Sequence, residues 1–372
     1  MAMSLTRGRP LMRTSYAQDM GLLNTRGKRA GVGVILVLAV LLPFLATDGL
    51  LVVFATGLAA CIGAIGLNLV TGYAGQVSLG HAFFLGIGAY TAAVISGDPE
   101  GRTLGLGISL LPVWLLGAGV VAAAVGLVVS PLAVRLRGLY LAVVTIGLVF
   151  LGEHIFKEWD SVTGGPGVGR PSARPRLFGF DLAADGAMLT REQKLYLLML
   201  VLVVVFAIAA RNIARSDVGR AFAAIRDRDV AAAVVGVNLM RHKAIAFTVS
   251  SFYAGCAGAL VYTVTGFVEP GSFSLLLSVQ YVAMILIGGV ATISGSIMGA
   301  LFVSSLNTAS RELAAGLPFI GAVTGGGALN VFQLEGILYG LLIIGFLIFE
   351  PRGLYGIWLR ARTYWTSWPF TY

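Results

Sequence analysis

The chain has 372 residues, of which 57% are hydrophobic and only 12% are charged. Soluble domains carry about 25% charged residues, so this composition excludes an ordinary water-soluble protein and indicates a membrane protein. The net charge of +9 does not indicate nucleic-acid binding, because the basic residues lie in short segments between apolar runs rather than on one patch.

Ten apolar runs follow one another along the chain, and in lipid such runs must be helical because every backbone polar group needs an internal partner. We expect spans at about 30–47, 50–70, 80–96, 108–134, 138–156, 195–210, 244–267, 278–293, 297–314 and 333–350. The predicted fold class is therefore an all-α polytopic membrane protein with about ten transmembrane helices. The basic start followed by an apolar run also fits a secretory signal, but an uncleaved first span is favoured because the downstream chain is membranous too.

Lys and Arg concentrate before the first span, after the fourth, between the sixth and seventh, and after the tenth. Basic loops stay on the cytoplasmic side, so we expect both termini to be cytoplasmic. The predicted organisation is a basic cytoplasmic N-terminal tail (1–29), a transmembrane domain (30–350) and a cytoplasmic C-terminal tail (351–372).

Two segments between spans are long enough for structure of their own. The outer one, 157–194, contains "WDSVTGGPGVGRPSARPR", which predicts a turn-rich loop. The inner one, 211–243, carries helix N-cap signals at Ser216–Asp217 and at Asp229, and Gly236 is placed to end the second helix. The inner segment therefore predicts two short helices at the cytoplasmic face.

Residues 66–90 read "GLNLVTGYAGQVSLGHAFFLGIGAY", without any acid, Lys or Arg. Glycine costs about 1 kcal/mol in a helix interior, so the repeated glycines indicate close helix packing or a broken helix. We expect a break at 71–79 between two apolar helices, a broken Gly-rich membrane element. Its polar side chains either line a solute path or hydrogen-bond to neighbouring helices, and both interpretations stay open.

Catalytic chemistry is not indicated. His81, His154 and His242 are scattered, Cys61 and Cys256 lie inside apolar runs, and "GLLNTRGK" does not have the spacing of a phosphate-binding loop. We therefore expect no metal, no cofactor and no enzyme activity in this chain. If ATP drives its function, another chain binds the nucleotide.

Six stretches of the chain resemble one known family, in the right order and over about residues 50–360. They are "GLNLVTGYAGQVSLGHAFFLGIGAYTAA", "GLYLAVVTIGLVFL", "WDSVTGGPGVG", "GRAFAAIRDRDVAAAVVGVN", "ILIGGVATISGSIMGA" and "FEPRGLYGIW". They are similar to the LivM-type permease subunit of bacterial branched-chain amino-acid ABC importers. One departure is Ala291, which stands where relatives have glycine.

The resemblance implies a multi-pass permease of the bacterial cytoplasmic membrane that forms a translocation path with a second, LivH-like permease. Two cytoplasmic ATPase subunits use ATP and Mg²⁺, and an extracytoplasmic binding protein delivers branched-chain or related amino acids. Lipid is the surrounding medium, and no nucleic acid is involved. A permease for urea or short-chain amides is a close alternative.

The resemblance also implies roles for particular residues. Residues 230–236 are similar to the coupling motif of importer permeases, although Val230 replaces its acid. The candidates for the ATPase-coupling loop are Asp217, Gly219, Arg220, Ala223, Arg226, Ala231, Ala232 and Gly236. The candidates for the translocation path are Asn68, Tyr73, Gln76, Ser78 and His81, and those for docking the binding protein are Trp159, Thr163, Gly164 and Gly165.

Two other classes are disfavoured by the residues. An ion-coupled secondary transporter needs ionisable groups inside the membrane, and this chain has almost none near mid-span. An intramembrane enzyme needs paired catalytic groups, and His81 has no acid or Cys in its own stretch.

Overall fold

The computed structural model describes residues 26–136, 138–177, 179–184, 186, 189–316, 320–321, 329–350 and 352–367. Most of the predicted N-terminal tail and the last five residues of the predicted C-terminal tail lie outside these ranges.

A helix forms at each of the ten predicted spans, which confirms the helical fold class. These helices are α2 (Arg26–Leu41), α3 (Asp48–Asn68), α4 (His81–Ser96), α5 (Leu111–Arg135), α6 (Leu139–Glu158), α8 (Arg191–Arg215), α10 (Leu239–Thr265), α11 (Leu275–Gly288), α12 (Ile293–Gly316) and α13 (Val331–Phe349). Within the described residues, five helical segments are long and apolar enough to cross a membrane: Asp48–Tyr73, Leu111–Arg135, Leu139–Glu158, Arg191–Arg215 and Leu239–Thr265. The number of crossings and the side of the termini stay predictions.

The remaining elements are short helices and two-residue strands. The helices are η1 (Leu42–Phe44), α7 (Asp160–Thr163), α9 (Asp217–Val234), η3 (Pro270–Phe273) and α14 (Gly353–Ser367). The strands are β1 (Arg170–Pro171), β2 (Arg176–Leu177), β3 (Phe180–Asp181), β4 (Phe267–Val268), β5 (Ile320–Gly321) and β6 (Leu329–Asn330). β1 pairs antiparallel with β4, β2 antiparallel with β3, and β5 parallel with β6.

The core lies where α3, α4 and α10 meet, and α10 also packs along α5. Glycines set the closest approach: a Cβ atom on Gly88 of α4 would overlap the backbone of Gly255 on α10. Small residues at a membrane helix interface let the backbones approach in this way. The glycines of the 66–90 stretch thus serve close packing as well as the break.

A break is present between α3 and α4, but it begins at residue 74 and not at residue 71 as predicted. α3 continues into a π-helical segment, η2 (Leu69–Tyr73), and residues 74–80 are not helical. The neighbouring helices satisfy part of the freed backbone: Leu79 N–H donates to Thr145 Oγ1 of α6 at 2.9 Å, and Ala82 N–H donates to Ser278 Oγ of α11 at 3.0 Å. Gln76 and Ser78 of the break are buried, whereas Gly75 and Val77 are exposed, so the neighbouring helices enclose the break in part.

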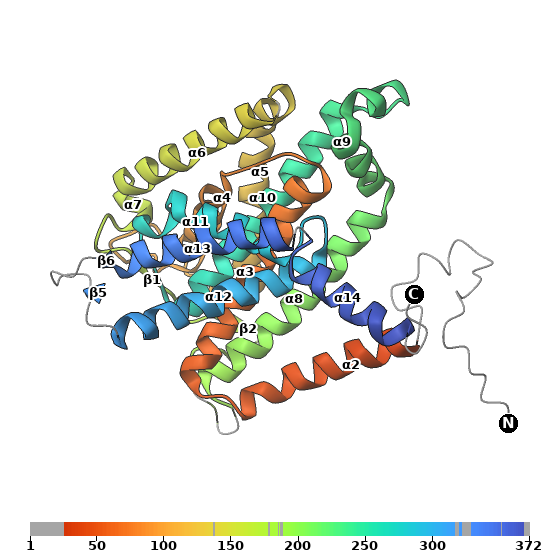
Figure 1. Ribbon diagram of the computed structural model, residues 1–372. Helices are drawn as coiled ribbons and strands as arrows, with labels where there is room; N and C mark the ends of the chain where they lie inside the picture. Colours follow the sequence, from red (N-terminus) through yellow and green to blue (C-terminus); the bar gives the residue numbers. More distant parts are fainter. Residues whose placement is uncertain are drawn as a thin grey trace.

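The two long inter-span segments lie at opposite ends of the helix bundle. α9 extends beyond the bundle at one end, whereas α7 and β1 lie at the other (Figure 1). α8 is longer than its predicted span of 195–210, because a capping box between Thr190 and Gln193 starts it early and Ser216 ends it late. Inner residues 211–215 thus belong to α8.

Candidate functional site

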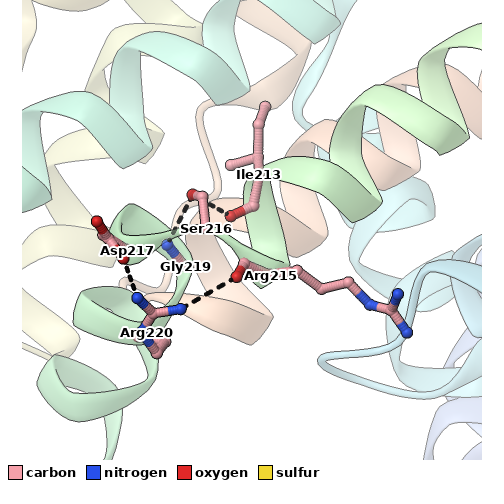
Figure 2. A network of polar contacts seen from close by, with 6 residues as sticks. All are labelled: Ile213, Arg215, Ser216, Asp217, Gly219 and Arg220. Atoms are coloured by element: carbon pink, nitrogen blue, oxygen red, sulfur yellow. Dashed lines mark hydrogen bonds and ion pairs between the residues drawn. The ribbon is translucent and has the colours of Figure 1, made fainter. Parts of the chain in front are cut away.

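The corner between α8 and α9 is held by a local polar network (Figure 2). Ser216 Oγ donates to the Ile213 carbonyl at 2.7 Å and accepts from Gly219 N–H at 3.4 Å. Arg220 donates to the Arg215 carbonyl at 3.3 Å and forms an ion pair with Asp217. A Cβ atom on Gly219 would overlap the backbone carbonyl of Ala214, so only glycine lets α9 start this close to α8.

α9 consists of two helical pieces, as the sequence predicted. Arg228 has extended backbone angles (φ −158°, ψ 105°) inside the element, and Ser216 caps the first piece. Gly236 has φ +91°, in the left-handed region that glycine favours, and it follows the second piece directly.

The second piece of α9 exposes large apolar side chains although the surrounding segment is strongly charged. We call Val230, Val234 and Val235 the valine patch; their exposed fractions are 65%, 84% and 83%. The three valines were not among the coupling candidates; of the candidates on this piece, Ala231 is exposed and Ala232 is buried. An exposed apolar patch within a strongly charged segment is typical of an interaction surface.

The first piece of α9 touches the broken element directly. Arg226 donates from Nη1 to the Gly72 carbonyl at 3.3 Å and also pairs with Asp227 at 3.1 Å. Gly75 packs against the same arginine, because a Cβ atom there would lie 3.1 Å from Arg226 Cα. The structure thus brings together one coupling candidate and the end of the π-helical segment.

A second connection runs through α10. Lys243 is 94% buried, its Nζ lies 3.8 Å from Asp229 Oδ2 of α9, and its carbonyl accepts a hydrogen bond from Gln76 Nε2 at 3.3 Å. Gln76 of the break, Lys243 of α10 and Asp229 of α9 are therefore linked in series.

A cavity of about 530 Å³ lies between these elements. Its polar lining consists of Gln76, Arg226, Asp227, Arg228, Asp229 and Lys243, and its apolar lining includes Leu136, which follows α5, and Leu141 in the first turn of α6. The volume falls in the range of small-molecule sites, about 300–1,000 Å³.

The candidates for the translocation path differ from one another in burial and in hydrogen bonding. Asn68 is buried, with Nδ2 donating to Thr292 O at 2.9 Å and to Ser296 Oγ at 2.7 Å, while Oδ1 accepts from Ala291 N–H at 2.9 Å. Tyr73 is half-buried at the end of η2, and Ser78 is buried, with its Oγ accepting from Gly80 N–H at 3.4 Å.

Gln76 and His81 each keep one buried polar atom without a partner among the described residues, Gln76 Oε1 and His81 Nε2. The His81 ring packs against Tyr281, with 4.8 Å between centroids. Asn68 is thus fully used in holding neighbouring helices, whereas Gln76 and His81 retain hydrogen-bonding capacity. A path role for these five residues stays a prediction.

The candidates for binding-protein docking lie at the opposite end, around α7. Trp159 is 55% exposed, whereas Thr163, Gly164 and Gly165 are buried. Arg102 donates to the Gly164 carbonyl at 2.6 Å, which ties the loop after α4 to this segment. Of the four candidates, only Trp159 presents a large side chain at the surface, and docking stays a prediction.

Arg170 organises that same end and was missed from the sequence. It is 3% exposed and donates to the carbonyls of Val162 (2.7 Å), Ala93 (2.7 Å) and Leu104 (2.8 Å). Burial lowers the pKa of its guanidinium, while Tyr262 and Tyr90 act in the opposite direction. Lys243 was missed likewise; it follows Arg241 and His242 at the edge of an apolar run, and the sequence there carries no signal that distinguishes the buried cation from its exposed neighbour.

No group of three or more His, Cys, Asp or Glu side chains suited to a metal ion occurs within the described ranges. The helices, the buried break and the exposed α9 define a multi-pass integral membrane protein. The chain belongs to the family described as branched-chain amino acid transport system / permease component, whose model matches residues 49–348.

Individual proteins similar to this chain have the same description as the family. The chain is 32% identical to the high-affinity branched-chain amino acid transport system permease protein LivM of Escherichia coli (strain K12), over 86% of this chain and 73% of the relative. It is 31% identical to LivM of Salmonella typhimurium over the same shares. It is 24% identical to the permease protein LivH of E. coli (strain K12), over 64% of this chain and 77% of the relative. The resemblance to LivM-type permeases is thereby confirmed. No solved structure matches the chain.

Proposed function

We propose that this chain is the transmembrane permease subunit of an ATP-driven importer for branched-chain or related amino acids in the bacterial cytoplasmic membrane. It forms the translocation path with a second, LivH-like permease. Two cytoplasmic ATPase subunits bind and hydrolyse ATP with Mg²⁺, and an extracytoplasmic binding protein delivers the cargo. The chain itself catalyses no reaction and needs no cofactor. Membership of the permease family supports the proposal.

The valine patch is the structural observation that supports the docking of an ATPase subunit on this chain. Val230, Val234 and Val235 are exposed on a segment whose neighbours include Arg228, Asp229 and Arg241, so this segment faces water rather than lipid. Leaving three valines in water is unfavourable by about 1.5–3 kcal/mol for each side chain relative to full burial. A soluble partner that covers the patch removes this cost. In an importer, the soluble partner on the cytoplasmic side is the ATPase.

The contacts of α9 support a route by which ATPase closure would move the path residues. The network at Ser216 and the close fit of Gly219 against Ala214 hold the start of α9 in a fixed position relative to α8. Arg226 and the series Asp229–Lys243–Gln76 then join α9 to the broken element. Because packed elements move as rigid bodies, a displacement of α9 is transmitted to residues 72–76.

Co-purification from native membranes in mild detergent, followed by mass spectrometry of the intact complex, tests the composition. We expect this chain, a second permease and two copies of ATPase subunits. Reconstitution in proteoliposomes then tests the activity: leucine, isoleucine or valine supplied with the binding protein should accumulate only when the vesicles contain ATP. Urea and acetamide, offered in the same way, test the alternative cargo.

Uptake that continues without ATP, by a complex that contains no ATPase, would refute the importer and favour an ion-coupled carrier. Uptake of urea or acetamide in place of the amino acids would support the ATP-driven importer but show that its transported solute is a urea-type or amide compound.

A further inference from the structure

The helix α14 carries an apolar stripe that the rest of the described chain leaves largely uncovered. The members of the stripe recur at helical spacing and so lie along one face: Leu354, Ile357, Trp358, Ala361 and Tyr364. The exposed fractions of Ile357, Trp358 and Tyr364 are 45%, 53% and 57%, and Ala361 is exposed too. The second half of α14 extends away from the helix bundle (Figure 1).

Basic side chains border this stripe on both sides. At about 100° of rotation per residue, Arg360 and Arg362 fall just beyond its two edges. α14 contains no acidic residue, and between residues 350 and 367 three arginines accompany a single acid, Glu350. The segment therefore carries an excess of positive charge beside an exposed apolar and aromatic face. This arrangement is typical of a helix that lies in the interface between membrane and water.

The position of α14 in the chain places it at that interface. The preceding helix, α13, has 19 residues and ends at Phe349. Its length of about 28 Å matches the hydrocarbon thickness of a bilayer, about 30 Å. Ile348 and Phe349 are exposed, and α14 starts at Gly353, four positions after α13 ends. α14 therefore begins where the hydrocarbon layer ends.

The start of α14 is held firmly, so the direction of its stripe is set by the fold. α14 packs against α11 and α12. A Cβ atom on Gly353 would lie 2.5 Å from the carbonyl oxygen of Ile287, so only glycine permits this approach. Arg360 forms an ion pair with Glu350, whose side chain is only 13% exposed. These contacts join α14 to the ends of the neighbouring helices.

We propose that α14 binds anionic phospholipid, with its apolar stripe among the upper acyl chains and the arginines at its edges beside the lipid phosphates. Tyrosine and tryptophan are favoured at this depth, and each basic residue near an anionic surface strengthens the attraction. The inference goes beyond the proposed function, because it concerns the lipid and neither the cargo nor the ATPase.

The test labels the two faces of α14 in the complete complex. Cys61 and Cys256 are buried, so a cysteine introduced at an exposed position is labelled selectively. Ala361→Cys places an environment-sensitive fluorophore in the stripe. Thr363→Cys is the matched control, because Thr363 is also exposed but lies about 200° further around the helix. Both proteins are reconstituted in vesicles of phosphatidylcholine and phosphatidylglycerol, with a nitroxide quencher on the upper acyl chain of one lipid at a time.

We expect the label at position 361 to emit at shorter wavelength than the label at 363 and to be quenched by the nitroxide lipids. The label at 363 should be quenched little. Nitroxide phosphatidylglycerol should quench the label at 361 more strongly than nitroxide phosphatidylcholine at the same fraction. Adding Arg362→Gln should lower this preference about fivefold, the share of one basic residue at an anionic surface. Adding Arg241→Gln, which removes an exposed cation outside α14, should leave the preference unchanged.

Equal quenching of the two labels, or no quenching of either, would overturn the interfacial position of α14. Short-wavelength emission at 361 that the lipid quenchers do not reach would show that a protein partner covers the stripe, which also overturns the inference. A preference for phosphatidylglycerol that is absent, or that Arg362→Gln leaves unchanged, would overturn the binding of anionic lipid. None of these readouts depends on transport, so each outcome leaves the test of the proposed function separate.

Discussion

The Oδ1 atom of Asn68 accepts a hydrogen bond from the N–H of Ala291 at 2.9 Å, although the two residues are 223 positions apart in the chain. Asn68 ends α3 just before the π-helical segment, and Ala291 lies in the turn between α11 and α12. The same side chain donates to Thr292 O and Ser296 Oγ. The break is thus anchored to the turn that precedes α12.

Replacing Ala291 by glycine should stabilise the protein. Ala291 has φ +59°, the only positive φ of a non-glycine residue in the described part of the chain. The left-handed conformation costs an L-residue about 1–2 kcal/mol, and glycine adopts it without that cost, so we expect Ala291→Gly to gain about 1 kcal/mol. The thermal midpoint in detergent measures the change. Ala59→Gly, inside α3, is the control and should lower the midpoint; a lower midpoint for Ala291→Gly as well would contradict the prediction.

Replacing Asn68 by leucine should destabilise the protein. The change leaves the Ala291 N–H without its acceptor and removes the hydrogen bonds that Asn68 Nδ2 donates to Thr292 O before α12 and to Ser296 Oγ in α12. Unpaired buried groups cost about 1–3 kcal/mol each in soluble proteins and less in membranes, so we expect a total loss of about 1–3 kcal/mol. Thr56→Val removes an exposed hydrogen bond within α3 and should change the midpoint little. Equal midpoints for the two variants would show that Asn68 is not an anchor.

Replacing Arg226 by alanine should uncouple ATP hydrolysis from uptake. The side chain donates to Gly72 O and packs on Gly75, so its loss removes one of the two connections between α9 and the break. A hydrogen bond from a charged donor contributes about 1.5–3 kcal/mol, so uptake per ATP hydrolysed should fall about tenfold or more. Uptake and phosphate release are measured on the same vesicles, with Arg241→Ala as the control. An unchanged ratio of uptake to hydrolysis would remove Arg226 from the coupling route.

Introducing a charge into the valine patch should detach the ATPase without unfolding the permease. Val234 is 84% exposed, so Val234→Asp disturbs no core packing. Burying an unpaired carboxylate at an interface is strongly unfavourable, and we expect the ATPase to be lost from the purified complex while the thermal midpoint of the permease stays the same. Val168→Asp, on the exposed loop near α7, is the control and should retain the ATPase. Retention of the ATPase by Val234→Asp would place its docking surface elsewhere.

The secondary structure and the break were predictable because their signals are local. Long apolar runs must be helical in lipid, and the polar, Gly-rich stretch 71–79 indicates an interruption, which the structure has at residues 74–80. The capping signals at Ser216 and Gly236 likewise lie next to the turns they define. The family could also be recognised from the sequence, because six short stretches resemble it and occur in the same order.

The helix ends were less accurate. α8 continues past its apolar run at both ends, because capping by Thr190 and Ser216 decides where a helix starts and stops whereas hydropathy decides only what is buried. The candidate site was likewise predictable only in part. Residues near the break were correctly placed on an interrupted element, but the residue types alone did not distinguish Asn68, whose amide makes three hydrogen bonds, from Gln76, whose Oε1 atom has no partner in the described part of the chain.

The sequence by itself determined the membrane class, the ten apolar helices, the position of the break and the family, since each depends on composition or on residues close together in the chain. Only the tertiary structure decided that Asn68 meets Ala291, that Arg226 meets Gly72 and that Lys243 is buried beside Asp229. The first two contacts join residues 223 and 154 positions apart, and the third joins two successive helices. Their geometry follows from how the helices pack against one another, which no single segment specifies.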